Sequence, residues 1–209
     1  MATFAQLKAK IADDVARSDL TSQIEHEVLA AIEDCSIERF WFNETRGYTF
    51  STVAGTSDYT ISPTAAIQDF VKVDSVKATI GGNPVVLDRY DADEIDTLIA
   101  YNGTDGQPYC YGYYNQTFRL YPIPGDIYTV RVAGHYKLTA LSADGDTNAW
   151  TVEGYELIRA RAKSRLYVNV IRNQQEAAAA NAVYESVLFR LRAETSRRVR
   201  TGRVKPSSW

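Results

Sequence analysis

The sequence is poor in the residues that build redox and metal centres. Its 209 residues include only two cysteines, Cys35 and Cys110, and two histidines, His26 and His135. Two cysteines are too few for a disulfide framework or, by themselves, for a zinc site. The histidines fall in different regions of the chain and neither has a motif partner. We therefore expect no bound metal and synthesis in a reducing cytoplasm.

Long hydrophobic runs are also absent. None approaches the roughly 20 apolar residues that a membrane-spanning helix needs. The first residues, Met1–Phe4, lead into a polar, charged stretch that has no hydrophobic core of a signal peptide. We therefore expect neither a membrane protein nor a secreted one.

Motifs of common enzymes are missing as well. The chain has no G-x-G-x-x-G, no Walker loop and no G-x-S-x-G elbow. Asp144, Asp146 and Asn148 have the spacing of a calcium loop, but Ala149 and Tyr155 stand where glycine and glutamate are needed. We predict no enzyme activity and no cofactor. A carboxylate pair assembled only by the fold remains open.

What the chain does contain is an uneven distribution of charge. Residues 1–152 carry 11 basic and 21 acidic side chains, a balance of −10. Residues 153–209 carry 12 basic and 5 acidic ones, a balance of +7, which the net charge of −3 hides. The proportions of hydrophobic and charged residues are those of a globular protein, which excludes wholesale disorder.

Residues 1–45 are predicted to form two helices, the first part of a helical domain. Capping-box spacings at Thr3–Gln6 and Ser22–Glu25 mark their starts. Behind them lie apolar stripes of helical period, Phe4, Leu7, Ile11 and Val15, then Ile24, Val28, Ala31, Ile32 and Cys35. Cys35 is therefore expected in the core, and His26 on the solvent face.

Residues 46–145 change to the period of two that is typical of strands. Turn residues at 55–58 and 81–83 predict two hairpins, one joining strands 48–53 and 59–61, the other joining 70–80 and 84–87. Further strands are predicted over 109–114, 117–121 and 127–138, with a short helix over 91–100. The acidic residues in the first turn of that helix suit its dipole, so we assign them to capping.

Three tyrosines, Tyr109, Tyr111 and Tyr113, alternate along one predicted strand and so share a face of the sheet. Such a row could bind sugars or stack on nucleobases. The simpler interpretation is a sheet face covered by its own domain or by another subunit. The acidic balance of this region also disfavours nucleic acid.

Two further helices over 146–192 complete the predicted helical domain. Arg161, Arg165 and Arg172 lie together as a basic stripe beside the apolar face of the first helix. A charged stripe is usually a solvated face, but we predict that this one contacts an acidic surface of a neighbouring subunit. The last residues, 193–209, have cations all round a helix axis, and they predict an extended basic tail.

Together these segments predict an α+β fold. The N- and C-terminal helices form a helical bundle, a central antiparallel β-sandwich-like region is inserted between them, and the basic tail extends from the end.

Several short segments, spread over about 200 residues, have an order and spacing that can be compared with those of known protein families. They are Thr3–Leu7, Ile11–Asp14, Arg39–Glu44, Phe50–Gly55, Gly106–Pro108, Arg119–Pro124, Asp146–Trp150, Leu157–Lys163 and Thr201–Pro206. No single segment is diagnostic. Their order and spacing resemble the head–tail adaptor proteins of short-tailed bacteriophages, the SU10-type adaptors and, more distantly, the P22-like tail accessory factor.

The resemblance implies a structural role in the virion, at the head–tail junction. Such subunits form a twelvefold ring on the portal, with the helical part against the portal protein and the β-rich part toward the tail. The ring extends the channel through which genomic DNA passes without specific binding, and it is a platform for nozzle, tail and tail-fibre proteins. Some relatives are suspected of degrading cell walls, but no catalytic carboxylates are recognisable here.

The tail is then expected to be the main portal-docking element. A segment without partners in its own domain can become ordered on binding. The residues predicted to contact the portal are Arg197, Arg198, Arg200, Arg203, Lys205 and Trp209. Two alternatives stay open: a nucleic-acid-binding protein that uses this tail, and a cell-wall hydrolase with paired carboxylates in a cleft.

Overall fold

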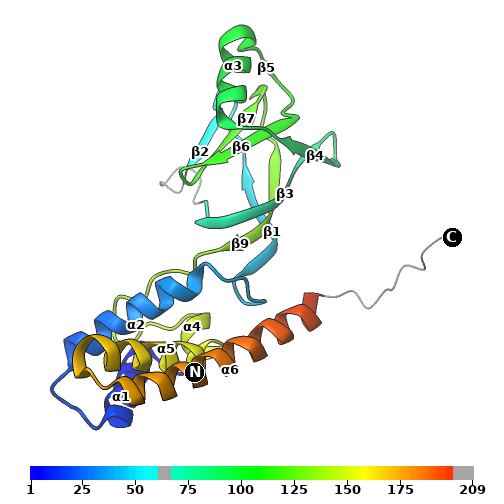
Figure 1. Ribbon diagram of the computed structural model, residues 1–209. Helices are drawn as coiled ribbons and strands as arrows, with labels where there is room; N and C mark the ends of the chain where they lie inside the picture. Colours follow the sequence, from blue (N-terminus) through cyan, green and yellow to red (C-terminus); the bar gives the residue numbers. More distant parts are fainter. Residues whose placement is uncertain (61–66, 200–209) are drawn as a thin grey trace. The chain divides into compact units, whose positions relative to one another are not determined.

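The computed structural model describes residues 1–60 and 67–199, and it confirms the α+β fold class (Figure 1). The chain divides into two compact units. The helical unit comprises Met1–Asn43 and the described residues from Leu138 onward, and the strand unit comprises Glu44–Lys137. The strand unit is thus an insertion between two parts of the helical unit.

The second crossing between the units comes earlier than the predicted boundary at 145/146. Leu141 is buried in the core of the helical unit. The backbone carbonyls of Asp144 and Asp146 accept hydrogen bonds from Ala5 and Phe4. The segment 138–145 therefore packs with the helices, although its sequence has no helical period.

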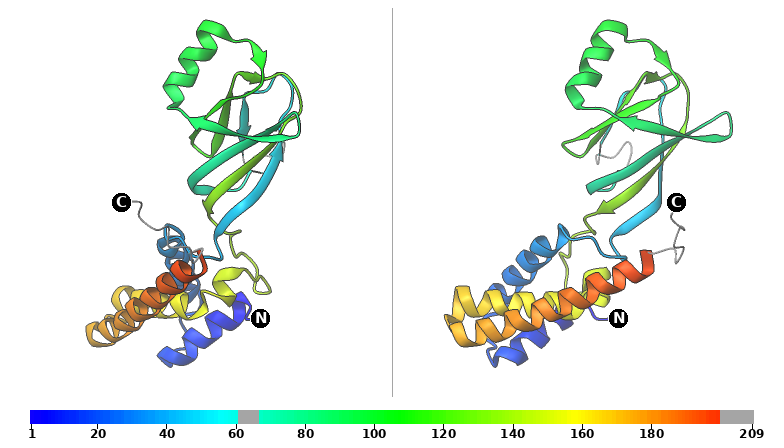
Figure 2. Two further views of the ribbon diagram at one scale, coloured as in Figure 1. Left: turned by 90° about the vertical axis from the view of Figure 1, so that its right-hand side faces the viewer. Right: turned by 45° about the vertical axis from the view of Figure 1, so that its right-hand side comes forward.

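The helical unit contains five α-helices and one π-helical turn in its described residues: α1 (Phe4–Val15), α2 (Thr21–Ser36), α4 (Ala149–Val152), α5 (Tyr155–Leu166), η1 (Tyr167–Ile171) and α6 (Gln174–Val199). Figure 2 shows α5 and α6 running side by side. The capping box at Thr3 and Gln6 begins α1 as predicted. The predicted box at Ser22 and Glu25 is wrong, because α2 begins at Thr21 without a side-chain cap.

The core of the helical unit is formed by side chains from both of its segments, the one before the strand unit and the one after it. Trp150, Phe4 and Phe40 are almost completely buried there, and aromatic contacts link Phe40 to Trp150 edge to face. Cys35 is buried in the same core as predicted, and His26 lies on the exposed face of α2. Burial of these large apolar side chains is the main stabilising contribution.

The predicted extended tail is wrong for its first seven residues. Helix α6 continues through 193 and ends at Val199. Leu191 and Thr195 are buried on its inner face, and the Thr195 hydroxyl donates to the Leu191 carbonyl oxygen at 2.8 Å. The apolar stripe of the sequence ends at Leu191, so it did not predict that the helix continues past Thr195. The Thr195 hydroxyl can be buried because its hydrogen-bonding partner is a carbonyl group of the same helix. Residues 200–209 lie outside the described part of the chain.

The strand unit contains nine described strands and one helix: β1 (Glu44–Ser51), β2 (Asp58–Thr60), β3 (Phe70–Ile80), β4 (Asn83–Arg89), α3 (Ala92–Asn102), β5 (Asp105–Gly106), β6 (Cys110–Tyr114), β7 (Thr117–Tyr121), β8 (Ile123–Pro124) and β9 (Thr129–Tyr136). Seven form one curled sheet in the order β1-β9-β3-β4-β6-β7-β2 (Figure 2). The sheet is mixed rather than purely antiparallel, because β4 and β6 run parallel.

One predicted hairpin is present and the other is not. Strands β3 and β4 pair around Gly81 and Gly82, whose positive φ angles of 57° and 81° fit a tight turn. Within the described residues, up to Thr60, the segments before and after Gly55 do not pair with each other. Instead β1 pairs with β9 and β2 pairs with β7, so long-range partners replace the local one.

The tyrosine row belongs mainly to the core of the strand unit. Tyr111 is buried, and Tyr113 packs beside it against Phe118. The Tyr113 hydroxyl donates to the Phe70 carbonyl oxygen at 3.0 Å. Tyr109, just before β6, is the exposed member and contacts Tyr121. The interpretation of a face covered by its own domain therefore holds for Tyr111 and Tyr113.

Candidate assembly surfaces

The predicted arginine stripe faces acidic residues of the same chain. The Arg161 guanidinium donates to Asp34 of α2 at 2.8 Å, and Arg165 donates to the same carboxylate at 2.9 Å. Arg165 also donates to Glu27 at 2.8 Å. These bonds join α5 to α2. Arg161 and Arg165 therefore already have acidic partners within one subunit, and their predicted contact with a neighbouring subunit stays a prediction.

Glu27 is the innermost group of this network, with only 4% of its surface exposed. Its second oxygen accepts a hydrogen bond from Asn169 at 2.8 Å. Asn169 belongs to the π-helical turn η1, which changes the direction of side chains between α5 and α6. A buried carboxylate needs such partners, because its charge is costly to remove from water.

Arg172, the third member of the stripe, lies apart from the other two. It ends η1 with a φ of 58°, a left-handed conformation that is uncommon for residues with a side chain. Its side chain is exposed, and within 1–60 and 67–199 it has no ion-pair partner. The structure therefore brings Arg161 and Arg165 together but not Arg172.

Of the predicted portal-binding residues, one contacts other side chains of the same chain and one has no such contact, while the others lie outside the described residues. Arg198 donates to Glu194 at 2.6 Å, and its guanidinium carbon lies 4.3 Å from the ring centre of Trp41. Arg197, the residue before it, is exposed and has neither an ion pair nor a ring contact in the described structure. Arg200, Arg203, Lys205 and Trp209 lie outside the described residues.

A second charged cluster, which sequence reasoning missed, joins α1 to α5. The Asp14 carboxylate accepts two hydrogen bonds from Arg159, at 2.6 and 2.9 Å, and lies 3.4 Å from the ammonium group of Lys163. Burial raises the pKa of Asp14, but Arg159 and Lys163 outweigh burial and hold that pKa below its ordinary value of 3.8. Only the spacing of Arg159 and Lys163, four residues apart, signalled a shared helix face.

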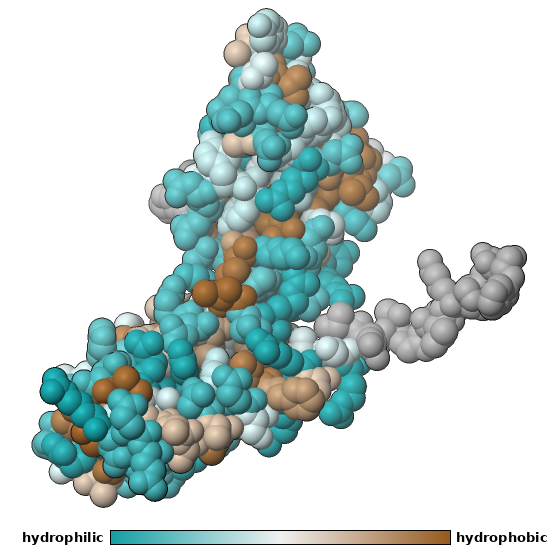
Figure 3. Space-filling model, in the orientation of Figure 1, coloured by the Kyte–Doolittle hydropathy of each residue, from teal (hydrophilic) through white to brown (hydrophobic). Residues whose placement is uncertain are grey.

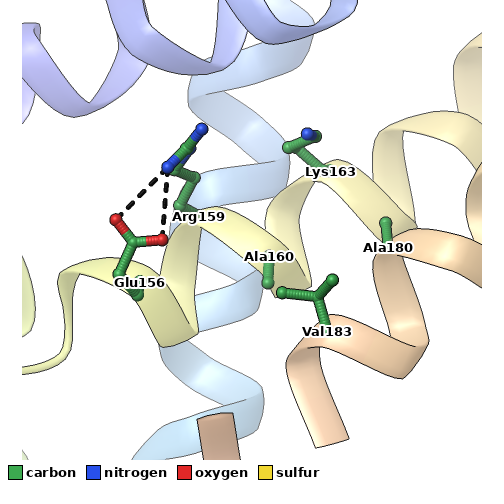
Figure 4. A pocket seen from close by; sticks show the side chains of 6 residues that line it. All are labelled: Glu156, Arg159, Ala160, Lys163, Ala180 and Val183. Atoms are coloured by element: carbon green, nitrogen blue, oxygen red, sulfur yellow. Dashed lines mark hydrogen bonds and ion pairs between the residues drawn. The ribbon is translucent and has the colours of Figure 1, made fainter. Parts of the chain in front are cut away.

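Arg159 and Lys163 also line the edge of a pocket between α5 and α6, with a volume of about 220 Å³. Figure 4 shows Ala160 and Val183 pointing toward each other across the gap between the two helices. Glu156 completes the edge and pairs with Arg159 at 3.2 Å. The pocket thus has an apolar floor of small side chains and a charged edge.

Apolar side chains are also exposed on both units, as Figure 3 shows. On the helical unit the most exposed large one of α6 is Phe189, at 76%. On the strand unit Val85 and Val86 are exposed on β4, and Tyr101 at the end of α3 is 88% exposed. Such side chains are common at protein–protein interfaces.

Among the described residues, potential metal ligands do not cluster and both thiols are buried. No group of three potential metal ligands occurs among them. Burial raises the pKa of the Cys35 thiol to about 12 and that of Cys110 to about 11, so neither thiol is a ready nucleophile. Asp144 and Asp146 instead serve the fold, since Asp146 accepts backbone hydrogen bonds from Ser142 and Ala143.

No helix in the described residues is long and apolar enough to cross a bilayer. A comparison with curated proteins gives no match. A family model described as SU10 adaptor protein matches residues 2–206, nearly the whole chain. The chain therefore belongs to the SU10 adaptor family of bacteriophage adaptor proteins.

Proposed function

We propose that this protein is a subunit of the head-to-tail adaptor ring of a short-tailed bacteriophage. In this role twelve copies dock under the portal, extend the DNA channel and receive nozzle, tail and tail-fibre proteins. The observation that carries the proposal is the family match over residues 2–206, because it covers both units and most of residues 200–209. The protein then acts by binding other virion proteins and not by catalysis.

Differences between the two units favour a different binding role for each. Ion pairs join α5 to α1 and α2, and they join α6 to Glu38 after α2, which favours a rigid helical unit. The strand unit exposes apolar residues on β4 and α3. We assign portal docking to the helical unit with residues 197–209, and tail attachment to the strand unit.

The docking element is tested by ending the chain at Val199. This end point keeps Arg192 and Arg198, whose contacts with Glu38 and Trp41 hold the end of α6 in place. Attachment of the full-length and shortened chains to purified portal of the same phage is measured by sedimentation. We expect the shortened chain to remain folded by circular dichroism and to lose most of its attachment.

A matched variant separates residues on α6 from those beyond it. Arg197→Ala removes an exposed cation of α6 while leaving the chain at full length. We expect it to weaken attachment less than removal of residues 200–209, which contain three cations. Undiminished attachment of the shortened chain would sink the docking assignment. Loss of DNA binding without loss of portal binding would instead favour the nucleic-acid alternative.

A further inference from the structure

Phe189 is an aromatic side chain without a role in the fold of its own unit. It lies on α6 with 76% of its surface exposed, whereas Leu188 and Leu191 on either side are buried. A large apolar side chain held out on a rigid helix suits insertion into a pocket of another protein, where aromatic residues often dominate binding.

The pocket between α5 and α6 has the size and chemistry to receive such a ring. Its volume of about 220 Å³ exceeds the roughly 150 Å³ of an engineered apolar cavity that binds benzene. Its floor is formed by Ala160, Ala180 and Val183, and Val183 is 52% exposed. Arg159 and Lys163 at the edge are paired with Asp14, so the apolar floor is the part of the pocket that suits an aromatic ring.

The pocket and Phe189 lie on different sides of the same helix. At 100° per residue, Phe189 is about 180° around α6 from Ala180 and about 120° from Val183. A single copy therefore has no means of filling its pocket with its own Phe189. The exposed residues Ala179, Ala182 and Ser186 lie between the two sites on this helix, and their small side chains allow another subunit to approach closely.

We propose that Phe189 of one copy inserts into the α5–α6 pocket of the next copy. This contact rests on the proposed ring and names the surfaces that join its subunits. A projection and a receptacle on different sides form a head-to-tail interface, which repeats around a ring or along a filament. It accounts for both features, whereas the stripe of Arg161 and Arg165 is already paired within one subunit.

Cross-linking between two single-cysteine variants tests the contact directly. Glu185→Cys, one turn from Phe189, and Ala179→Cys, beside the pocket, are exposed positions that leave Phe189 and the pocket lining intact. Each is made in the full chain, and the two variants are mixed and treated with a short bis-maleimide with and without purified portal. The two native cysteines are buried and interfere little. We expect a cross-linked dimer in the mixture and much less in either variant alone, because one copy must contribute each cysteine.

Two substitutions give an independent readout by light scattering. Phe189→Ala is expected to weaken association between copies by about 30-fold or more, the loss typical of a central aromatic contact. Val183→Trp fills the pocket and is expected to do the same. Leu29→Ala, an exposed apolar residue on α2, is the matched control and is expected to associate like the unmodified protein.

Each outcome decides the proposal. Normal association of Phe189→Ala, together with no cross-link between the two cysteine variants, overturns this contact while leaving the proposed function intact. A cross-link from position 185 to portal, and none between copies, also overturns it. Failure of the unmodified protein to associate with itself or with portal overturns the proposed function and this contact together.

Discussion

Three carboxylates decide how the helices of the helical unit are joined. Asp14 holds Arg159, Glu27 holds Arg165, and Asp34 holds both Arg161 and Arg165. All three acids precede residue 40 and all three arginines follow residue 150, so each pair closes a long loop of chain. Partly buried pairs of this kind contribute more than exposed ones, because water screens them less.

Asp14→Asn is expected to destabilise the protein by about 1.5–3 kcal/mol at neutral pH, since it removes charged hydrogen bonds from Arg159. The folded-state pKa of Asp14 lies below its ordinary value of 3.8. Its contribution is therefore present above that ordinary pKa and is lost as the pH falls through the lower folded-state pKa. Urea unfolding at pH 7 and at decreasing pH below 4 measures the difference between variant and wild type.

Asp13→Asn is the matched control for this measurement, because Asp13 is the exposed neighbour on the same helix. We expect it to change stability by less than about 0.5 kcal/mol. A difference between Asp14→Asn and wild type that stays constant down to pH 2 would contradict the assigned role of the Asp14 charge.

The two thiols are expected to be unreactive in the folded protein. With pKa values raised to about 12 for Cys35 and about 11 for Cys110, fewer than about one thiol in a thousand is ionised at pH 8. Labelling with a chromogenic disulfide reagent at pH 8 is predicted to be slow until denaturant is added, after which both thiols react. Rapid labelling of either one before unfolding would refute the prediction.

At the scale of secondary-structure elements, the end of α6 is held by contacts with residues far away in the sequence. Arg192 donates to Glu38 at 2.6 Å, and Arg198 lies over the ring of Trp41. Both partners follow α2, in the segment around Phe40 that packs on Trp150. These contacts extend the helix beyond the end of its apolar stripe.

Arg198→Ala is expected to loosen the last turn of α6, because it removes the ion pair with Glu194 and a cation–aromatic contact with Trp41 worth about 0.5–1 kcal/mol at an exposed site. Hydrogen exchange of the amides from Thr195 to Val199 measures the effect, and we expect these amides to exchange several-fold faster. Arg197→Ala, one residue away and without that contact, serves as the control. Equal exchange in the two variants would show that the contacts of Arg198 do not hold this turn.

On the scale of the whole molecule, the two folded units have more even charge balances than the first and last parts of the sequence. Residues 1–43 and 138–199 together carry 13 basic and 15 acidic side chains, a balance of −2. The strand unit carries 7 basic and 11 acidic ones, a balance of −4. Only residues 200–209 keep an excess of +3. Neither unit therefore has the net positive charge that favours general binding to DNA.

The full-length protein is expected to bind DNA weakly and with a shallow dependence on salt. If Arg197 and the three cations beyond Val199 are its contacts, the slope of log affinity against log salt is no steeper than about −3.6. Fluorescence anisotropy with a labelled duplex at several salt concentrations measures this slope. A steeper slope, retained in the chain that ends at Val199, would point to a further DNA-binding surface.

The sequence by itself determined what depends on neighbouring residues. The capping box of α1, the turn at Gly81 and Gly82, the buried face that carries Cys35 and the α+β class follow from local patterns. The family could also be recognised from the order of short segments. Each of these features rests on residues that are close together along the chain or on their order.

Only the tertiary structure decided which distant residues meet. It placed β1 beside β9, continued α6 through Thr195 and paired the arginines of α5 with carboxylates of α1 and α2. It also formed the α5–α6 pocket and left Phe189 exposed. Charge and apolar pattern show which side chains need partners, but the partners come from helices and strands that only folding brings together.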